Sequence, residues 1–301
     1  MDSRQITEGS VVVGVDGSAC SEVALRWAVD EARRTGRPLH VVHALEVETL
    51  LSDEHQLGTG EAPTSSDPVV TAAMAVVRTT APEVQATAHS VTGPAPTTMI
   101  AASRVAGTVV VGSPPRRVIP AALLGSVSQE VAVHAHCPVV VVRENSTQGG
   151  DGLGQVVVGV DGSEASEPAL GYAFAHAAST GCGLTAVHTW WWEPLEGVNQ
   201  DEPWTGDWTQ IASQEESLVA ESLAGWAEKY PNVPVRRHVV RGDPVVELLR
   251  ESRYASLLVM GSRGRGGFAG LLLGSASRRV LKRATCPVAI VRSFGAGRPA
   301  T

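Results

Sequence analysis

The sequence predicts an α/β protein built from two tandem copies of a five-stranded, doubly wound domain with a parallel sheet. Three observations support this prediction. The chain repeats itself over about half its length, short apolar runs alternate with helical patterns, and a glycine-rich turn follows the fourth apolar run of each copy. The length of 301 residues and the 43% hydrophobic content suffice for two domains, each with its own core.

The repeat is visible at two offsets. The segment VVGVDGS at residues 12–18 returns at residues 157–163, an offset of 145. Beyond the second strand the offset becomes 149, because four net residues are inserted in the second copy. A period this long indicates a duplicated domain rather than a solenoid. We expect copy 1 to span residues 1–146 and copy 2 residues 147–301, with the glycine-rich residues 144–154 as the linker.

Within copy 1, continuous apolar runs predict buried strands and an apolar face repeating every three to four residues predicts helices. Ser18 or Ser21 is expected to cap the first helix, and Gly36 to end it. The polar segment 46–67 is expected to be a loop, and copy 2 departs from the pattern mainly at Trp190-Trp191-Trp192. The expected strands are 10–15, 39–44, 87–91, 108–111 and 139–143, and the expected later helices are 69–78, 97–105 and 126–134.

The most informative stretch is Gly261-Ser262-Arg263-Gly264, followed after nine residues by Gly274-Ser275. It lies between an apolar run at 257–260 and an expected helix at 275–283. Glycines let the backbone approach a phosphate, and a helix start offers unpaired N–H groups and the positive end of the helix dipole. The stretch therefore predicts a phosphate-binding loop, although ordinary turn residues remain the alternative.

An aspartate ends the first strand of each copy, at Asp16 and Asp161. Ligands of such sheets bind at the carboxyl ends of the strands. We therefore expect each aspartate to lie beside the glycine loop that follows strand four. Capping of the first helix is the alternative role.

Composition excludes several classes of protein. A net charge of −7 argues against a nucleic-acid binder, and no apolar run is long enough to span a membrane. The four cysteines include no C-x-x-C pair, so a metal site or disulfide framework is not expected. Residues 1–10 lack the apolar core of a signal peptide. We expect a cytoplasmic protein.

The pattern G-x-x-G, nine residues, G-[ST] at Gly261, Gly264, Gly274 and Ser275 resembles the ATP-binding signature of the universal stress protein family. The resemblance covers nearly the whole chain twice, and the tandem form is similar to members from mycobacteria and other actinobacteria. It implies a Rossmann-like, adenine nucleotide alpha hydrolase-like fold with strand order 3-2-1-4-5, in which the copies pair through their final strands. It also implies bound ATP, with Mg²⁺ held through the phosphates.

Nucleotide-contacting residues follow from the same resemblance. In copy 2 they are Gly159, Asp161, Thr189, Gly261, Arg263, Gly264, Arg265, Gly274, Ser275, Ala276 and Ser277. In copy 1 they are Gly14, Asp16, Ala44, Gly112, Gly125, Ser126, Val127 and Ser128. Copy 1 departs from the signature, because Pro114 and Pro115 stand where copy 2 has Arg263 and Gly264. Proline has no N–H to donate, so we expect the first site to bind ATP more weakly or not at all.

The remaining polar and aromatic residues are open to two interpretations. His43 and His188 are expected to pack at a strand end rather than catalyse, because no serine or cysteine nucleophile pairs with either. Arg263 and Arg265 are either phosphate contacts or solvated loop charges. The Trp190–Trp192 run is expected to form core and interface surface, with adenine stacking as the alternative. Cys137 and Cys286 are expected to be small buried hydrophobic side chains.

Three functions remain open from the sequence. The first is an ATP-binding regulatory protein of stress response or growth control, in which bound nucleotide alters the surface offered to an unknown protein partner. The second is a slow ATPase or nucleotidyl transferase on the same fold. The third is a nucleotide-free scaffold. We also expect a homodimer, because the final strand of each copy is apolar.

Overall fold

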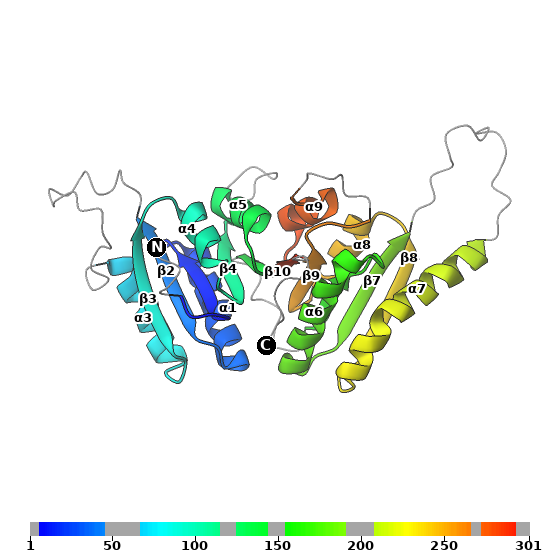
Figure 1. Ribbon diagram of the computed structural model, residues 1–301, viewed down its shortest axis with the longest axis horizontal. Helices are drawn as coiled ribbons and strands as arrows, with labels where there is room; N and C mark the ends of the chain where they lie inside the picture. Colours follow the sequence, from blue (N-terminus) through cyan, green and yellow to red (C-terminus); the bar gives the residue numbers. More distant parts are fainter. Residues whose placement is uncertain are drawn as a thin grey trace.

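The computed structural model describes residues 6–45, 67–114, 125–143, 154–190, 208–265 and 272–292. It forms one continuous ten-stranded sheet in the order β3-β2-β1-β4-β5-β10-β9-β6-β7-β8. Each half has the order 3-2-1-4-5, as predicted, and the two halves lie on either side of the centre in Figure 1. Within the described ranges, no helix is both long and apolar enough to cross a bilayer.

Strands and helices alternate in both copies. Copy 1 contains β1 (Val11–Val15), α1 (Ala19–Thr35), β2 (Leu39–Leu45), α3 (Pro68–Thr80), β3 (Ala86–Thr92), α4 (Ala95–Ala102), β4 (Thr108–Ser113), α5 (Ser126–His134) and β5 (Val139–Arg143). Copy 2 contains β6 (Val156–Gly159), a 3₁₀ turn η5 (Glu164–Ser166), α6 (Glu167–Thr180), β7 (Leu184–Trp190), α7 (Trp208–Lys229), β8 (Val235–Arg241), α8 (Pro244–Glu251), β9 (Leu257–Gly261), α9 (Ser275–Arg283) and β10 (Val288–Val291).

Local chemistry explains where these elements begin and end. The Ser18 side chain accepts a hydrogen bond from the Ser21 N–H and caps α1, and Gly36 ends that helix in the left-handed conformation at φ 66°. The helix expected at 97–105 is α4, which begins two residues earlier and ends three residues earlier. Its start differs because Pro96 occupies the first turn. Predictions for residues 46–66, the 144–153 linker, the boundary at 146/147, Pro115, Trp191 and Trp192 lie outside the described residues.

The core has two layers, one on each face of the sheet. Side chains of α1, α3, α6 and α7 cover one face, and those of α4, α5, α8 and α9 cover the other. Both layers contain residues of both copies, so the core continues across the centre of the sheet. Cys137 and Cys286 are 5% and 4% exposed within this core, which confirms their prediction as buried side chains. Burial raises the pKa of the Cys137 thiol to about 12 and of the Cys286 thiol to about 11.

The two copies join through an antiparallel pair of strands. β5 pairs with β10, with Val139 opposite Ile290 and Val141 opposite Val288, and we call this junction the seam. All other strand pairs in the sheet are parallel. The final strands on which the homodimer prediction rested therefore pair with each other inside one chain. A homodimer has to use another surface.

Candidate functional site

A cavity of about 500 Å³ opens in copy 2 at the carboxyl ends of β6 and β9. Its wall also includes β7, the start of α8 and the start of α9. The structure brings all the copy 2 residues named from the sequence to this wall: Gly159, Asp161, Thr189, Gly261, Arg263, Gly264, Arg265, Gly274, Ser275, Ala276 and Ser277. The volume lies in the range of ordinary small-molecule sites, roughly 300–1,000 Å³.

The start of α9 forms the polar end of the cavity. Gly274 is the N-cap residue, and no side chain caps this helix. The Gly274 N–H donates to the Ser262 carbonyl at 2.8 Å, and the Ser277 hydroxyl donates to the Gly261 carbonyl at 2.9 Å. These two bonds hold the helix start against the end of β9. The first-turn residues of α9 line the cavity, so the unpaired amides and the positive end of the helix dipole lie at its wall. This arrangement suits an anion.

Asp161 connects the first strand of copy 2 to the glycine loop. Its Oδ1 accepts from the Ser163 N–H at 3.0 Å and from the Ser163 hydroxyl at 2.7 Å, and its Oδ2 accepts from the Arg265 N–H at 2.7 Å. Burial raises the pKa of this carboxyl, but the hydrogen bonds from Ser163 and Arg265 outweigh it and hold the pKa below its ordinary value. Asp161 is therefore ionised at neutral pH.

Gly264 allows this close contact between loop and carboxylate. A Cβ atom placed on Gly264 would lie 2.9 Å from Asp161 Oδ2, closer than real Cβ atoms approach an oxygen. The exposed side chains of Arg263 and Arg265 lie on either side of this glycine at the mouth of the cavity. Arginine in this position suits a phosphate chain.

Sequence reasoning missed the apolar part of the wall. Leu248 and Pro244 of α8, Met260 of β9 and Val187 of β7 line the cavity together with the polar residues. The wall thus combines apolar side chains, which suit a flat ring, with polar groups, which suit charge. The only sequence signal for them is the apolar periodicity of α8, which also describes an ordinary core helix.

The corresponding residues of copy 1 occupy the equivalent elements but are packed differently. Gly14 and Asp16 lie at the end of β1, Ala44 in β2, Gly112 in β4, Gly125 before α5, and Ser126, Val127 and Ser128 in its first turn. The Ser128 hydroxyl donates to the Gly125 carbonyl at 3.0 Å, within its own helix start, whereas Ser277 reaches the strand. Asp16 is exposed, and its carboxylate accepts from Ser18 in its own turn.

The start of the first helix also lies closer to the glycine loop in copy 1. A Cβ on Gly112 would lie 2.6 Å from the Cys20 carbonyl oxygen, whereas a Cβ on Gly261 would lie 3.5 Å from the corresponding Ala165 oxygen. The 3₁₀ turn η5 moves this backbone away in copy 2. The ring of Pro114 adds a second restriction, since its Cδ lies 3.2 Å from a Cβ placed on Gly125. The described part of copy 1 has less room at this position.

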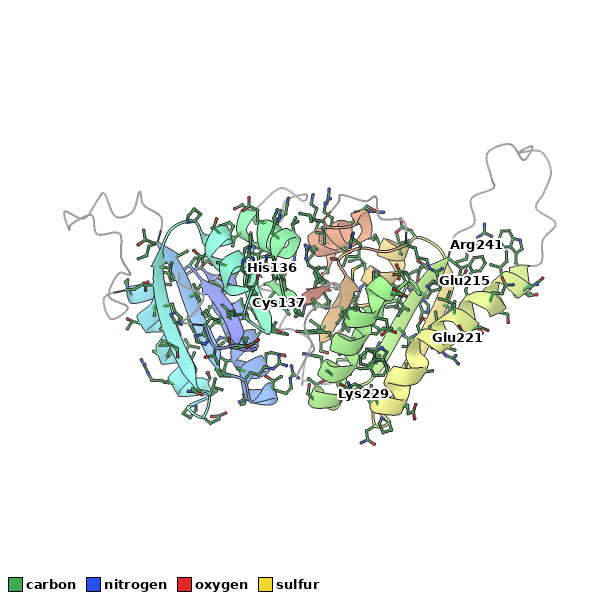
Figure 2. The ribbon with its side chains drawn as sticks, in the orientation of Figure 1. His136, Cys137, Glu215, Glu221, Lys229 and Arg241 are labelled. Carbon is green, nitrogen blue, oxygen red and sulfur yellow. The ribbon has the colours of Figure 1, made fainter. Side chains whose placement is uncertain are left out.

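Each strand-two histidine pairs with a carboxylate of its own copy. The two ring nitrogens of His188 contact the Val160 carbonyl at 2.8 Å and the carboxylate of Glu215 at 2.8 Å, and Figure 2 shows Glu215 on α7. His43 contacts Asp67 at 2.7 Å.

The ring of Trp190, at the end of β7, lies 6.1 Å from the ring of Trp208, the first residue of α7, measured between ring centroids. Among the described residues, no group of three or more His, Cys, Asp or Glu side chains is arranged to hold a metal ion.

The duplicated, doubly wound sheet with a cavity at its strand ends defines a tandem α/β protein of the class predicted from the sequence. The universal stress protein family model matches residues 9–143 and 153–292, so the chain belongs to this family. Universal stress protein Rv2623 of Mycobacterium tuberculosis is 39% identical over 290 residues, covering 94% of this chain and 96% of that protein.

A solved structure of comparable length has the same fold. A universal stress protein from Archaeoglobus fulgidus is 22% identical, covers 94% of this chain and 98% of its own, and superposes with a TM-score of 0.60. A universal stress protein in complex with cAMP is 25% identical and matches 48% of this chain and 100% of its own, with a TM-score of 0.38.

Proposed function

We propose that this universal stress protein is an ATP-binding regulatory module and that copy 2 holds the nucleotide. The single observation that carries the proposal is the cavity at the strand ends, which joins an uncapped helix start to an apolar wall. The triphosphate would contact the amides of α9 and the glycine loop, with Mg²⁺ bound through the phosphates. The adenosine would lie along Leu248 and Met260, near Asp161 and Thr189.

The same cavity supports regulation rather than rapid hydrolysis. Asp161 is the one carboxylate in the cavity wall as described, and both of its oxygens already accept hydrogen bonds from the protein. Within the part of the wall that the structure describes, no further carboxylate is placed to activate a water beside the phosphates. Bound nucleotide would instead favour one arrangement of the loop and of α9, and so change the surface offered to a protein partner.

The first prediction compares the two copies directly. We expect titration calorimetry of the full chain to find one strong site for ATP. Asp161→Ala should weaken that site by about tenfold or more, since a lost hydrogen bond to a charged group costs roughly 1.5–3 kcal/mol. Asp16→Ala is the matched control and should leave the strong site unchanged. Equal sites in the wild type, or equal effects of the two substitutions, would contradict the assignment.

A turnover assay separates the regulatory module from an enzyme. Ordinary enzymes turn over at roughly 1 per second or faster, so we expect ATP hydrolysis below about 0.1 per second. Faster hydrolysis that disappears in Asp161→Ala would favour an ATPase. Absence of any ATP binding in calorimetry would leave the family fold intact and remove the nucleotide role.

A further inference from the structure

Helices cover the seam on both faces of the sheet. On one face, equivalent residues of the two copies make equivalent contacts with each other. On the side of α5 and α9, the Arg143 guanidinium donates to the Leu281 carbonyl, and the Arg292 guanidinium donates to the Ala132 carbonyl at 3.0 Å. Arg292 is the copy 2 counterpart of Arg143, and Leu281 is the counterpart of Ala132, each at an offset of 149. This face is reciprocal, so it does not distinguish one copy from the other.

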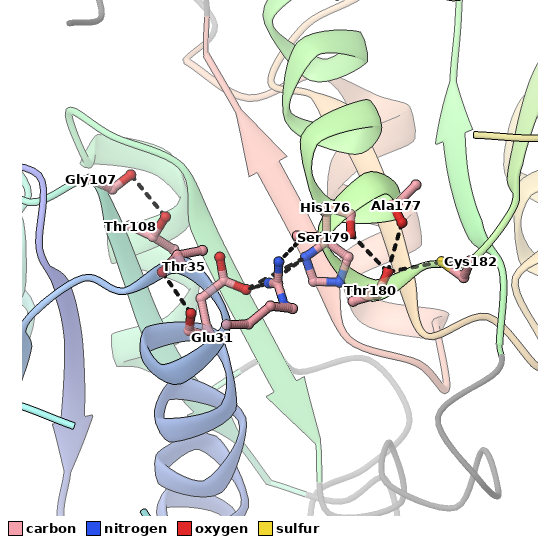
Figure 3. A network of polar contacts seen from close by, with 10 residues as sticks. Glu31, Thr35, Gly107, Thr108, His176, Ala177, Ser179, Thr180 and Cys182 are labelled. Carbon is pink, nitrogen blue, oxygen red and sulfur yellow. Dashed lines mark hydrogen bonds and ion pairs between the residues drawn. The ribbon is translucent and has the colours of Figure 1, made fainter. Parts of the chain in front are cut away.

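The opposite face, between α1 and α6, is not reciprocal. Glu31 of α1 and His176 of α6 are counterparts at an offset of 145, and so are Arg34 and Ser179. Figure 3 shows Glu31, His176 and Ser179 between the two helices. The Arg34 guanidinium donates to Glu31, to the Ser179 hydroxyl and, at 3.0 Å, to Nδ1 of His176. The cluster therefore consists of one Glu–Arg pair from copy 1 and one His–Ser pair from copy 2.

The chemistry of the cluster depends on this asymmetry. Glu31 is 6% exposed and His176 is 7% exposed, so the carboxylate is compensated within the protein by the single guanidinium. Arginine is always a donor, so Nδ1 of His176 must accept and the imidazole must be neutral. The ring of Trp27 lies parallel to the His176 ring at 6.1 Å and excludes water from one side. The cluster therefore combines one cation, Arg34, with one anion, Glu31, and a neutral acceptor, His176.

We propose that this cluster makes the α1 face of copy 1 pair selectively with the α6 face of copy 2, and rejects a second copy 1 from another chain. Pairing of two copy 1 faces would bring two buried carboxylates and two guanidinium groups to one axis. Pairing of two copy 2 faces would bring two histidines and two serines together without the bridging cation. Specificity of this kind comes from the cost of the wrong pair as much as from the contacts of the right one.

The test gives both sides of the cluster the same residues within the full chain, and we call the result the like-pair variant. His176→Glu with Ser179→Arg gives copy 2 the residues of copy 1, so the seam then joins two copy 1 faces. This variant would bury a second Glu–Arg pair in the space that a neutral histidine and a serine now fill, and desolvating two more charged groups there is costly. Exchange of the β5 and β10 amides with solvent deuterium should therefore accelerate by about 100-fold or more. The amides of β2 and β7, which lie away from the seam in each copy, are the internal control and should exchange as in the wild type.

A four-residue exchange is the matched control variant. Glu31→His, Arg34→Ser, His176→Glu and Ser179→Arg together move the Glu–Arg pair to copy 2 and the His–Ser pair to copy 1. The proposal requires this variant to regain protection of β5 and β10 to within about tenfold of the wild type. Wild-type protection in the like-pair variant, or equal loss in the exchanged variant, overturns the proposal. If the like-pair variant does not fold, folding of the exchanged variant with a protected seam supports the proposal, and its failure to fold overturns it.

Discussion

Gly264→Ala is expected to lower the affinity for ATP by about 10- to 100-fold. The added Cβ would lie 2.9 Å from Asp161 Oδ2, so the carboxylate and the loop cannot both keep their positions. The substitution therefore disturbs the Arg265–Asp161 hydrogen bond and the approach of the loop backbone to the phosphates together. Loss of one hydrogen bond to a charged group, at roughly 1.5–3 kcal/mol, accounts for the expected range. Titration calorimetry with ATP measures it.

Gly225→Ala in α7 is the control for this substitution. No atom lies within 4 Å of a Cβ placed on Gly225, and alanine favours a helix over glycine by about 0.5–1 kcal/mol. This control should bind ATP as the wild type does and should unfold at an equal or higher temperature. Unchanged ATP affinity in Gly264→Ala would mean that the glycine loop does not contact the nucleotide.

Acidification is expected to destabilise the fold well before its carboxylates are protonated. Burial, with Arg34 beside it, lowers the pKa of His176 to about 3, and burial and the neighbouring His89 lower the pKa of His40 to about 4. An unfolded histidine has a pKa near 6.5. Below that pH the two histidines bind protons in the unfolded chain but remain neutral in the folded chain. The free energy of unfolding therefore falls as the pH falls.

The expected effect is large because two histidines act together. Each contributes a slope of up to about 1.4 kcal/mol per pH unit, so the loss between pH 6.5 and 4.5 is on the order of 5 kcal/mol. Stability should be fully present above pH 6.5. Asp16, Asp67, Asp161 and Asp243 have pKa values lowered from 3.8, so their protonation adds to the loss only below that window.

Urea unfolding at a series of pH values measures this dependence. His176→Gln keeps an acceptor for Arg34 but does not titrate, so it should remove about half of the slope between pH 6.5 and 4.5. A wild-type slope in this variant would show that His176 is not the group responsible. A flat profile in the wild type itself would mean that both histidines are accessible to protons in the folded chain.

The fold was open to prediction because its signals are local and occur twice. Capping by Ser18, the left-handed Gly36 and the apolar runs of the strands each identify an element without knowledge of the rest of the chain. Because the domain is duplicated, each of these local signals occurs a second time in the other copy. The copy 2 residues around the cavity could be named because the glycine loop and the strand-one aspartate are contiguous motifs at strand ends.

Other features have no contiguous pattern and could not be predicted. Leu248 and Met260 form the apolar wall, but in sequence they are indistinguishable from core residues. The closer approach of Cys20 to Gly112 depends on how α1 starts, which differs from copy 2 by one 3₁₀ turn. The cluster around Arg34 joins residues about 145 positions apart, and nothing near Glu31 indicates a partner in α6.

The antiparallel pairing of β5 with β10 has a further consequence. The strand pairing is isologous in form, although the α1/α6 face of the seam is not reciprocal, and an interface of this form is complete once two units have joined, so it cannot extend into a filament. Here both units belong to one polypeptide, and their encounter is unimolecular. Dilution that would separate a dimer of single-copy proteins leaves this assembly intact, because the local concentration of one half around the other is set by covalent connection. The molecule thus keeps its paired architecture at any expression level.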